Sequence, residues 1–72
     1  MTKRDKDILV FIKNYMVEYG ITPTIREIGQ GVGLYSTSSV HKHLQKLAKE
    51  GEITPVKSYR YTVKGMRYVE DK

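Results

Sequence analysis

Residues 22–51 read TPTIREIGQGVGLYSTSSVHKHLQKLAKEG and contain two helix-start signals, with a glycine-rich segment between them. Thr24 and Glu27 have the T-x-x-E spacing of a capping box, in which each side chain accepts a hydrogen bond from the other residue's backbone N–H. Ser36 is a favourable N-cap residue, with Ser39 at the N3 position. The stretch therefore predicts a short helix, a tight turn and a longer helix.

The glycines and the apolar residues of this stretch refine that prediction. Gly29 lies inside the first helix, where glycine costs up to about 1 kcal/mol relative to alanine, so we expect it to allow close packing against a neighbouring helix. Gly33 and Gly51 are the expected ends of the two helices. Three- and four-residue steps predict the buried stripes, formed by Ile25, Ile28 and Val32 and by Val40, Leu44, Leu47 and Ala48.

Another helix precedes this stretch. Thr2 and Asp5 fit a second capping box, and Gly20 suits a left-handed helix end. The apolar residues between them recur at helical spacing, and we expect a core-facing stripe of Ile8, Phe11, Ile12, Tyr15, Met16 and Tyr19.

The residues beyond the third helix change from helical spacing to β-branched and aromatic runs, at Ile53, Tyr59, Tyr61 and Val63. They predict a two-stranded hairpin in which residues 52–54 pair with 59–63 and residues 55–58 form the turn. Residues 64–69 either continue the second strand past a bulge at Gly65 or form a third short strand. This order of elements is that of a winged helix-turn-helix, a mainly α fold with a small β-hairpin, and we expect one such domain over residues 1–72.

The charge distribution favours a polyanionic partner. The formal net charge is +5 and the pI is about 9.6. Residues 1–34 carry five basic and four acidic side chains, whereas residues 35–69 carry seven basic and two acidic ones. A basic half of this kind indicates nucleic-acid binding, and a basic surface kept for solubility is the alternative.

Other functional classes find little support in the sequence. The chain has no cysteine, which excludes disulfides, thiolate zinc sites and cysteine nucleophiles. His41 and His43 are two residues apart on a helix and point to different faces, so they do not hold a metal together. We expect no enzyme activity, no cofactor, no membrane partner and a cytoplasmic location, because catalytic constellations, a membrane span and a signal peptide are all absent from the sequence.

The start of the third helix and the hairpin carry the candidate contacts with DNA. In a helix-turn-helix, the N-terminal half of the second helix of the pair reaches base edges in the major groove. The hydroxyl residues 36–39 suit a helix tip pressed onto DNA, and His41 and Lys42 face outward beside them. In the wing, basic residues alternate with tyrosines and suit phosphate contacts, although a charged hairpin also prevents edge-to-edge aggregation.

Residues 22–53 resemble the N-terminal DNA-binding domain of the LexA family, and the resemblance extends over about residues 4–69. It rests on the Pro-Thr-x-x-Glu-Ile opening at Pro23, the Gly-Leu turn at Gly33, Ser36, and the His-Leu-x-x-Leu-x-x-x-Gly-x-Ile exit from His43 to Ile53. The resemblance implies sequence-specific binding of double-stranded DNA in transcriptional repression. It implies base reading by Ser36, Ser38, Ser39, His41 and Lys42, and we expect backbone contacts from Thr24, Arg26, Tyr35, Thr37, Lys46, Lys57, Arg60 and Lys64.

Two departures from the family pattern matter. The family has Asn and acidic residues in part of the stretch where this chain has Ser38, His41 and Lys42, so we expect an operator other than the usual SOS box. The second departure is that residues 1–72 do not include the Ser/Lys self-cleaving peptidase domain of the family. If the chain is complete, we expect neither autocleavage nor dimerisation through that domain, and stand-alone versions resemble products of phages or other mobile elements.

Three functional hypotheses remain open from the sequence. The first is a transcriptional regulator that binds a palindromic or pseudo-palindromic operator as a homodimer or as paired monomers. The second is a protein-interaction module, an adaptor or antirepressor, with a protein partner bound through Tyr35, Tyr59 and Tyr68. The third is non-specific DNA binding in replication or packaging.

Overall fold

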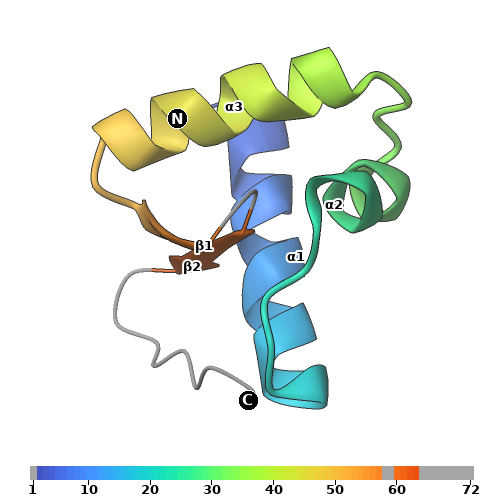
Figure 1. Cartoon of the computed structure of the whole chain (residues 1–72). Coiled ribbons are helices and arrows are strands. Elements are labelled where there is room, and N and C mark those ends of the chain that lie inside the picture. The colour runs from blue at the N-terminus through green and yellow to red at the C-terminus, as the bar shows by residue number, and fades with distance from the viewer. Residues whose placement is uncertain (1, 58–59, 64–72) are drawn as a thin grey trace.

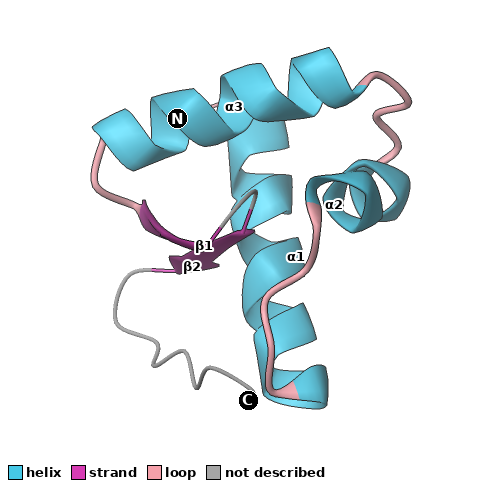
Figure 2. Ribbon diagram, in the orientation of Figure 1, coloured by secondary structure: helices cyan, strands magenta, loops and turns pink. Residues whose placement is uncertain are grey.

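The structure is a computed structural model that describes residues 2–57 and 60–63. Its elements are α1 (Lys3–Tyr19), α2 (Ile25–Val32), α3 (Thr37–Lys49), β1 (Ile53–Lys57) and β2 (Arg60–Val63). In Figure 1, α3 crosses the N-terminal part of α1, with α2 on one side of α1 and the hairpin on the other. Figure 2 shows that helices form most of the molecule. The predicted winged helix-turn-helix is confirmed.

The three predicted helix starts are confirmed, but only two of them have a side-chain cap. The hydroxyl of Thr2 accepts from the N–H of Asp5 at 3.2 Å, and the Asp5 carboxylate accepts from the N–H of Thr2 at 3.0 Å. Thr24 and Glu27 form the same pair of bonds, at 3.2 and 2.8 Å. Ser36 is the N-cap of α3, and its side chain makes no capping hydrogen bond with the described residues.

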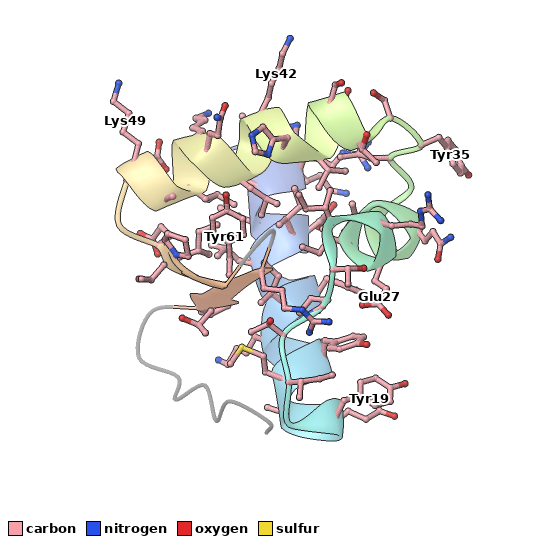
Figure 3. All side chains as sticks on the ribbon, viewed as in Figure 1. Tyr19, Glu27, Tyr35, Lys42, Lys49 and Tyr61 are labelled. Atoms are coloured by element: carbon pink, nitrogen blue, oxygen red, sulfur yellow. The ribbon has the colours of Figure 1, made fainter. Side chains whose placement is uncertain are left out.

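The predicted apolar stripes meet in one core. Its buried residues come from every helix and from the first strand, and they are Ile8, Ile12, Met16, Ile28, Val40, Leu44, Leu47 and Ile53. Phe11, Ile25, Val32 and Ala48 are partly buried against this core. The inclusion of Tyr19 in the core stripe was wrong, because its side chain is 60% exposed. Figure 3 shows Tyr19 at the far end of α1, beyond the part of that helix that α3 covers. The centroid of its ring lies 4.5 Å from the centroid of the Tyr15 ring.

Gly29 allows the close approach between α2 and α3 that its position predicts. A Cβ atom on this residue would lie 2.6 Å from the carbonyl oxygen of Leu34 and 3.2 Å from Cγ2 of Val40. The turn between the helices also needs Gly33, whose φ of 79° is left-handed. Gly20 and Gly51 end the other two helices as predicted, with φ values of 76° and 81°.

The hairpin is antiparallel, with Ile53 opposite Val63 and Thr54 opposite Thr62. Residues 55–58 were predicted as the turn, and for residues 55–57 this was wrong, because β1 continues to Lys57 and Pro55 pairs with Tyr61. Proline is tolerated here because each strand of a two-stranded sheet has an edge that needs no N–H donor. A register shift follows between Pro55 and Lys57. The predictions for Ser58, Tyr59 and residues 64–69 concern residues outside the described part of the chain.

Candidate nucleic-acid interface

The outer face of α3 carries the predicted base-reading residues. Val40, Leu44 and Leu47 hold the opposite face in the core. Around the outer face, Ser36, Ser38 and Lys42 are exposed, and Ser39 and His41 lie half-buried on its flanks. Figure 3 shows Lys42 and Lys49 projecting from α3 away from the rest of the molecule. The structure thus places all five predicted residues at the start of α3, with three of them exposed and two on the flanks of its outer face.

The start of α3 is suited to an anion. Its first turn contains no acidic residue, and among the described residues no side chain caps it. The free N–H groups and the positive end of the helix dipole favour a negatively charged group at this point. A DNA phosphate supplies such a group.

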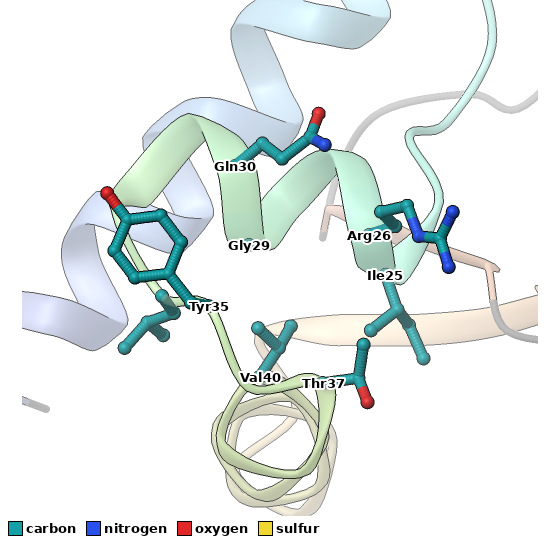
Figure 4. A pocket seen from close by; sticks show the side chains of 8 residues that line it. Ile25, Arg26, Gly29, Gln30, Tyr35, Thr37 and Val40 are labelled. Carbon is teal, nitrogen blue, oxygen red and sulfur yellow. The ribbon is translucent and has the colours of Figure 1, made fainter.

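An open pocket lies between α2 and the start of α3, with a volume of about 330 Å³. Arg26, Tyr35 and Thr37, three of the predicted backbone-contacting residues, line it (Figure 4). Gln30, which we did not predict, lines the same pocket from α2. Tyr35 is 95% exposed, so its ring is available to a macromolecular partner. The hydroxyl of Thr24 is instead used within the protein, where it accepts from the Glu27 N–H.

Two other predicted backbone contacts have partners inside the protein. The ammonium of Lys46 lies 3.2 Å from Oδ2 of Asp5, and its side chain is 47% exposed. The guanidinium of Arg60 donates to the carbonyl of Thr22 at 2.7 Å, which ties β2 to the loop before α2. Neither partner was predicted from the sequence, since each lies far from its residue in the chain. The side chain of Lys57 and the whole of Lys64 lie outside the described residues.

Asp5 is the centre of a polar cluster that the sequence did not reveal. Its side chain is fully buried, with Oδ1 2.7 Å from Nδ1 of His43 and Oδ2 within hydrogen-bond distance of Lys46 and of the Thr2 N–H. Burial by itself raises the pKa of Asp5, but the hydrogen bonds from His43, Thr2 and Lys46 outweigh it and hold that pKa well below its ordinary value. Asp5 is therefore ionised, and it joins the start of α1 to one flank of α3.

A second polar pair joins α1 to the start of α2. The hydroxyl of Tyr15 donates to Oε2 of Glu27 at 3.2 Å. The hydrogen bond from the Thr24 N–H lowers the pKa of Glu27, and burial together with the Glu27 contact raises that of Tyr15. The capping box of α2 is thus held in place from α1.

Over residues 2–57 and 60–63, no three His, Cys, Asp or Glu side chains lie together as metal ligands. No helix in this part of the chain is both long and apolar enough to cross a membrane.

Comparison with known proteins identifies the family of this chain. Residues 1–59 match the sequence model of the LexA DNA binding domain. The chain belongs to this family. The LexA repressor of Bacillus cytotoxicus is 46% identical over 72 residues, which cover 97% of this chain and 35% of that protein. The LexA repressors of Bacillus mycoides and Bacillus anthracis are each 55% identical over 53 residues, or 74% of this chain and 26% of each relative.

The family membership confirms the resemblance seen in residues 22–53. The chain spans about a third or less of the length of these curated LexA relatives. The matched LexA region contains both capping boxes, the glycine-rich turn and the whole of α3. The elements that build the candidate interface are therefore those of the LexA DNA binding domain.

Proposed function

We propose that this chain binds a specific sequence of double-stranded DNA and acts as a transcriptional repressor in the cytoplasm. The observation that carries the proposal is the exposed face of α3, in a chain that belongs to the LexA DNA binding domain family. An α-helix fits the major groove, and three buried side chains of α3 pack its opposite face into the core. The role requires binding and no catalysis.

The proposed contacts follow from the positions of the side chains on α3. Lys42 projects from α3 away from the rest of the molecule and suits the O6 and N7 acceptors of guanine. His41 and Ser39, on the two flanks, can donate to or accept from base edges, and Ser36 and Ser38 let the helix start approach the DNA closely. These side chains differ from the Asn and acidic residues of the family pattern, so the preferred operator differs from the usual one.

The proposed backbone contacts surround this face. Arg26, Tyr35 and Thr37 lie together at the pocket between α2 and α3 and suit one stretch of sugar-phosphate backbone. Thr24, Lys46, Lys57, Arg60 and Lys64 complete the proposed set. Repressors of the helix-turn-helix class bind half-sites about one helical turn apart, so we propose that two copies bind one pseudo-palindromic operator.

A selection of bound duplexes from a random library tests this proposal. We expect an enriched motif with two-fold symmetry, and affinity that falls steeply with salt. Replacing His41 and Lys42 together by alanine should relax the motif at defined positions. Lys13→Ala, which removes an exposed cation from α1, is the matched control and should leave the motif unchanged. Failure to enrich any sequence would contradict specific binding.

The protein-interaction hypothesis has one supporting observation of its own. Tyr35 at 95% and Val17 at 72% exposure present apolar surface to solvent. In that case Tyr35→Ala would abolish capture of a protein partner, and the chain would retain no duplex in the selection. An enriched DNA motif therefore decides between the two hypotheses.

A further inference from the structure

The outward side of α3 carries a stripe of polar residues that continues beyond those proposed above to read bases. Its members recur at steps of four, three and four residues, so they lie one above another on one side of the helix. They are Ser38, Lys42, Gln45 and Lys49, and all four are exposed. Figure 3 shows the two lysines projecting from α3 in the same general direction, away from the core. The outward stripe therefore runs from the first turn of α3 to its last.

The cations of α3 differ in whether the protein already pairs them. On one flank, the ammonium of Lys46 lies 3.2 Å from a carboxylate oxygen of the buried Asp5. Over the described residues, the structure shows no hydrogen bond or ion pair for the three long side chains of the outward stripe. The helix itself contains no acidic residue, and the first one after it is Glu50, its C-cap residue. The outward stripe thus presents two cations and an amide to a partner outside the protein.

The lengths of these side chains fit a helix whose start lies deepest in the major groove. A straight helix departs from the curved floor of the groove as it runs on, so residues farther from its start need longer side chains to reach DNA. Ser38, in the first turn, is short, whereas Lys42, Gln45 and Lys49 are long. This order of lengths matches contact with DNA along the whole helix.

The spacing of the outward stripe can be compared with that of base pairs. A helix rises about 1.5 Å per residue, so Gln45 lies about 4.5 Å and Lys49 about 10.5 Å beyond Lys42 along its axis. Successive base pairs are about 3.4 Å apart along the duplex axis, and farther apart along the inclined groove. Gln45 is therefore about one base pair beyond the one that faces Lys42, and Lys49 is about two to three beyond it.

We propose that Gln45 reads an adenine next to the base pair that Lys42 contacts, and that Lys49 binds a DNA phosphate farther along. The glutamine amide donates to N7 of adenine while its carbonyl accepts from N6, which is a bidentate pair. The ammonium of Lys49 is a point charge that suits a phosphate oxygen. Gln45 is thus a further specificity-determining residue, and Lys49 is a further anchor of α3. The inference rests on the proposed function and extends the DNA contacts of the outward stripe over the whole helix.

Selection of bound duplexes from a random library, repeated with Gln45→Ala, tests the base contact. We expect this variant to lose its preference at one position of the motif, which is adenine for the unmodified chain and adjoins the position relaxed by Lys42→Ala. The loss of discrimination at that position should be about 5- to 150-fold. Asn14→Ala removes an exposed amide from α1, and as the matched control it should leave every position of the motif unchanged.

A modified duplex tests the same contact on the unmodified chain. Placing 7-deazaadenine at that position removes the N7 acceptor of the base and leaves its pairing edge intact. The modified duplex should bind the unmodified chain more weakly than the normal duplex, and the Gln45→Ala variant should bind both equally. An equal response of the two proteins, or a Gln45→Ala motif identical to that of the unmodified chain, would overturn the assignment of Gln45 and leave the proposed function intact.

The salt dependence of affinity tests the phosphate contact. Lys49→Gln should weaken binding to every duplex, leave the motif unchanged, and lower the slope of log affinity against log salt by about one unit. A cation in the last turn also stabilises the helix dipole, so the stability of this variant in urea is measured separately. Lys13→Gln, which removes an exposed cation from α1, is the matched control and should keep the slope.

Two results would contradict the inference at different levels. A salt slope that is unchanged in Lys49→Gln would limit Lys49 to a role at the end of α3, and the proposed function would stand. If the unmodified chain enriches no sequence at all, the proposed function itself fails, and the inference fails with it.

Discussion

Gly29 of α2 lies against Val40 of α3 so closely that a Cβ atom on residue 29 would be 3.2 Å from Cγ2 of Val40. The same atom would lie 2.6 Å from the backbone oxygen of Leu34, in the turn between the two helices. Backbone atoms cannot move aside as the end of a flexible side chain can. The approach of α2 to α3, and with it the position of the candidate DNA-binding face, therefore depends on glycine at this point.

Gly29→Ala should destabilise the fold by about 1–3 kcal/mol, the usual cost of extra volume in a packed site. The free energy of unfolding in urea measures this effect. Gln30→Ala, at an exposed position of the same helix, is the control and should change stability by less than about 0.5 kcal/mol. Equal stability of the Gly29 variant would show that α2 and α3 can separate without loss.

The stability of the fold should decline in acid because of Asp5 and Glu27. Hydrogen bonds hold the pKa of both carboxyls below the ordinary value, so both bind protons less readily in the folded than in the unfolded chain. Their contribution is complete above the unfolded pKa of about 4 and is lost as the pH falls through the lower folded pKa. Unfolding measured in urea between about pH 2 and pH 7 should show this decline.

Asp5→Asn should lower the stability at neutral pH and make the acid decline shallower, because the lost carboxylate no longer contributes to it. Asp7→Asn, at an exposed position on the same helix, is the matched control and should leave both quantities close to those of the unmodified chain. An unchanged acid profile in the Asp5 variant would show that another group controls the decline.

Tyr15→Phe should remove the hydrogen bond that joins α1 to Glu27 at the start of α2. A hydrogen bond of this kind contributes about 0.5–1.5 kcal/mol, so a loss in that range is expected on thermal unfolding. Tyr19→Phe removes a hydroxyl from an exposed ring on the same helix and should have almost no effect. Equal losses in the two variants would contradict a specific role for the Tyr15 hydroxyl.

Arg60→Met should have two effects, because the guanidinium anchors the hairpin and is also one of the proposed contacts with the DNA backbone. Loss of its bond to the Thr22 carbonyl should destabilise the fold by about 1 kcal/mol. Loss of one phosphate contact should lower the slope of log affinity against log salt by about one unit. A destabilised variant with an unchanged salt slope would limit Arg60 to anchoring the hairpin.

Local signals in the sequence were sufficient to predict the three helices and the protein family. The capping boxes at Thr2 and Thr24 and the left-handed glycines act within one turn of chain, so their effect does not depend on the rest of the fold. The spacing of Val40, Leu44 and Leu47 likewise determines which face of α3 is buried and which is exposed. The fold and the outward face of the candidate site could therefore be predicted from the sequence.

Contacts between distant residues could not be predicted in this way. The sequence does not show that Tyr19 lies beyond the reach of the core or that Pro55 pairs with Tyr61, since both depend on where other elements end. Asp5 and His43 are 38 residues apart, and nothing in the sequence around either residue indicates that the two are in contact. Only the crossing of α1 and α3 brings them to 2.7 Å and buries the carboxylate, because a buried charge must find partners on whichever element the fold places beside it.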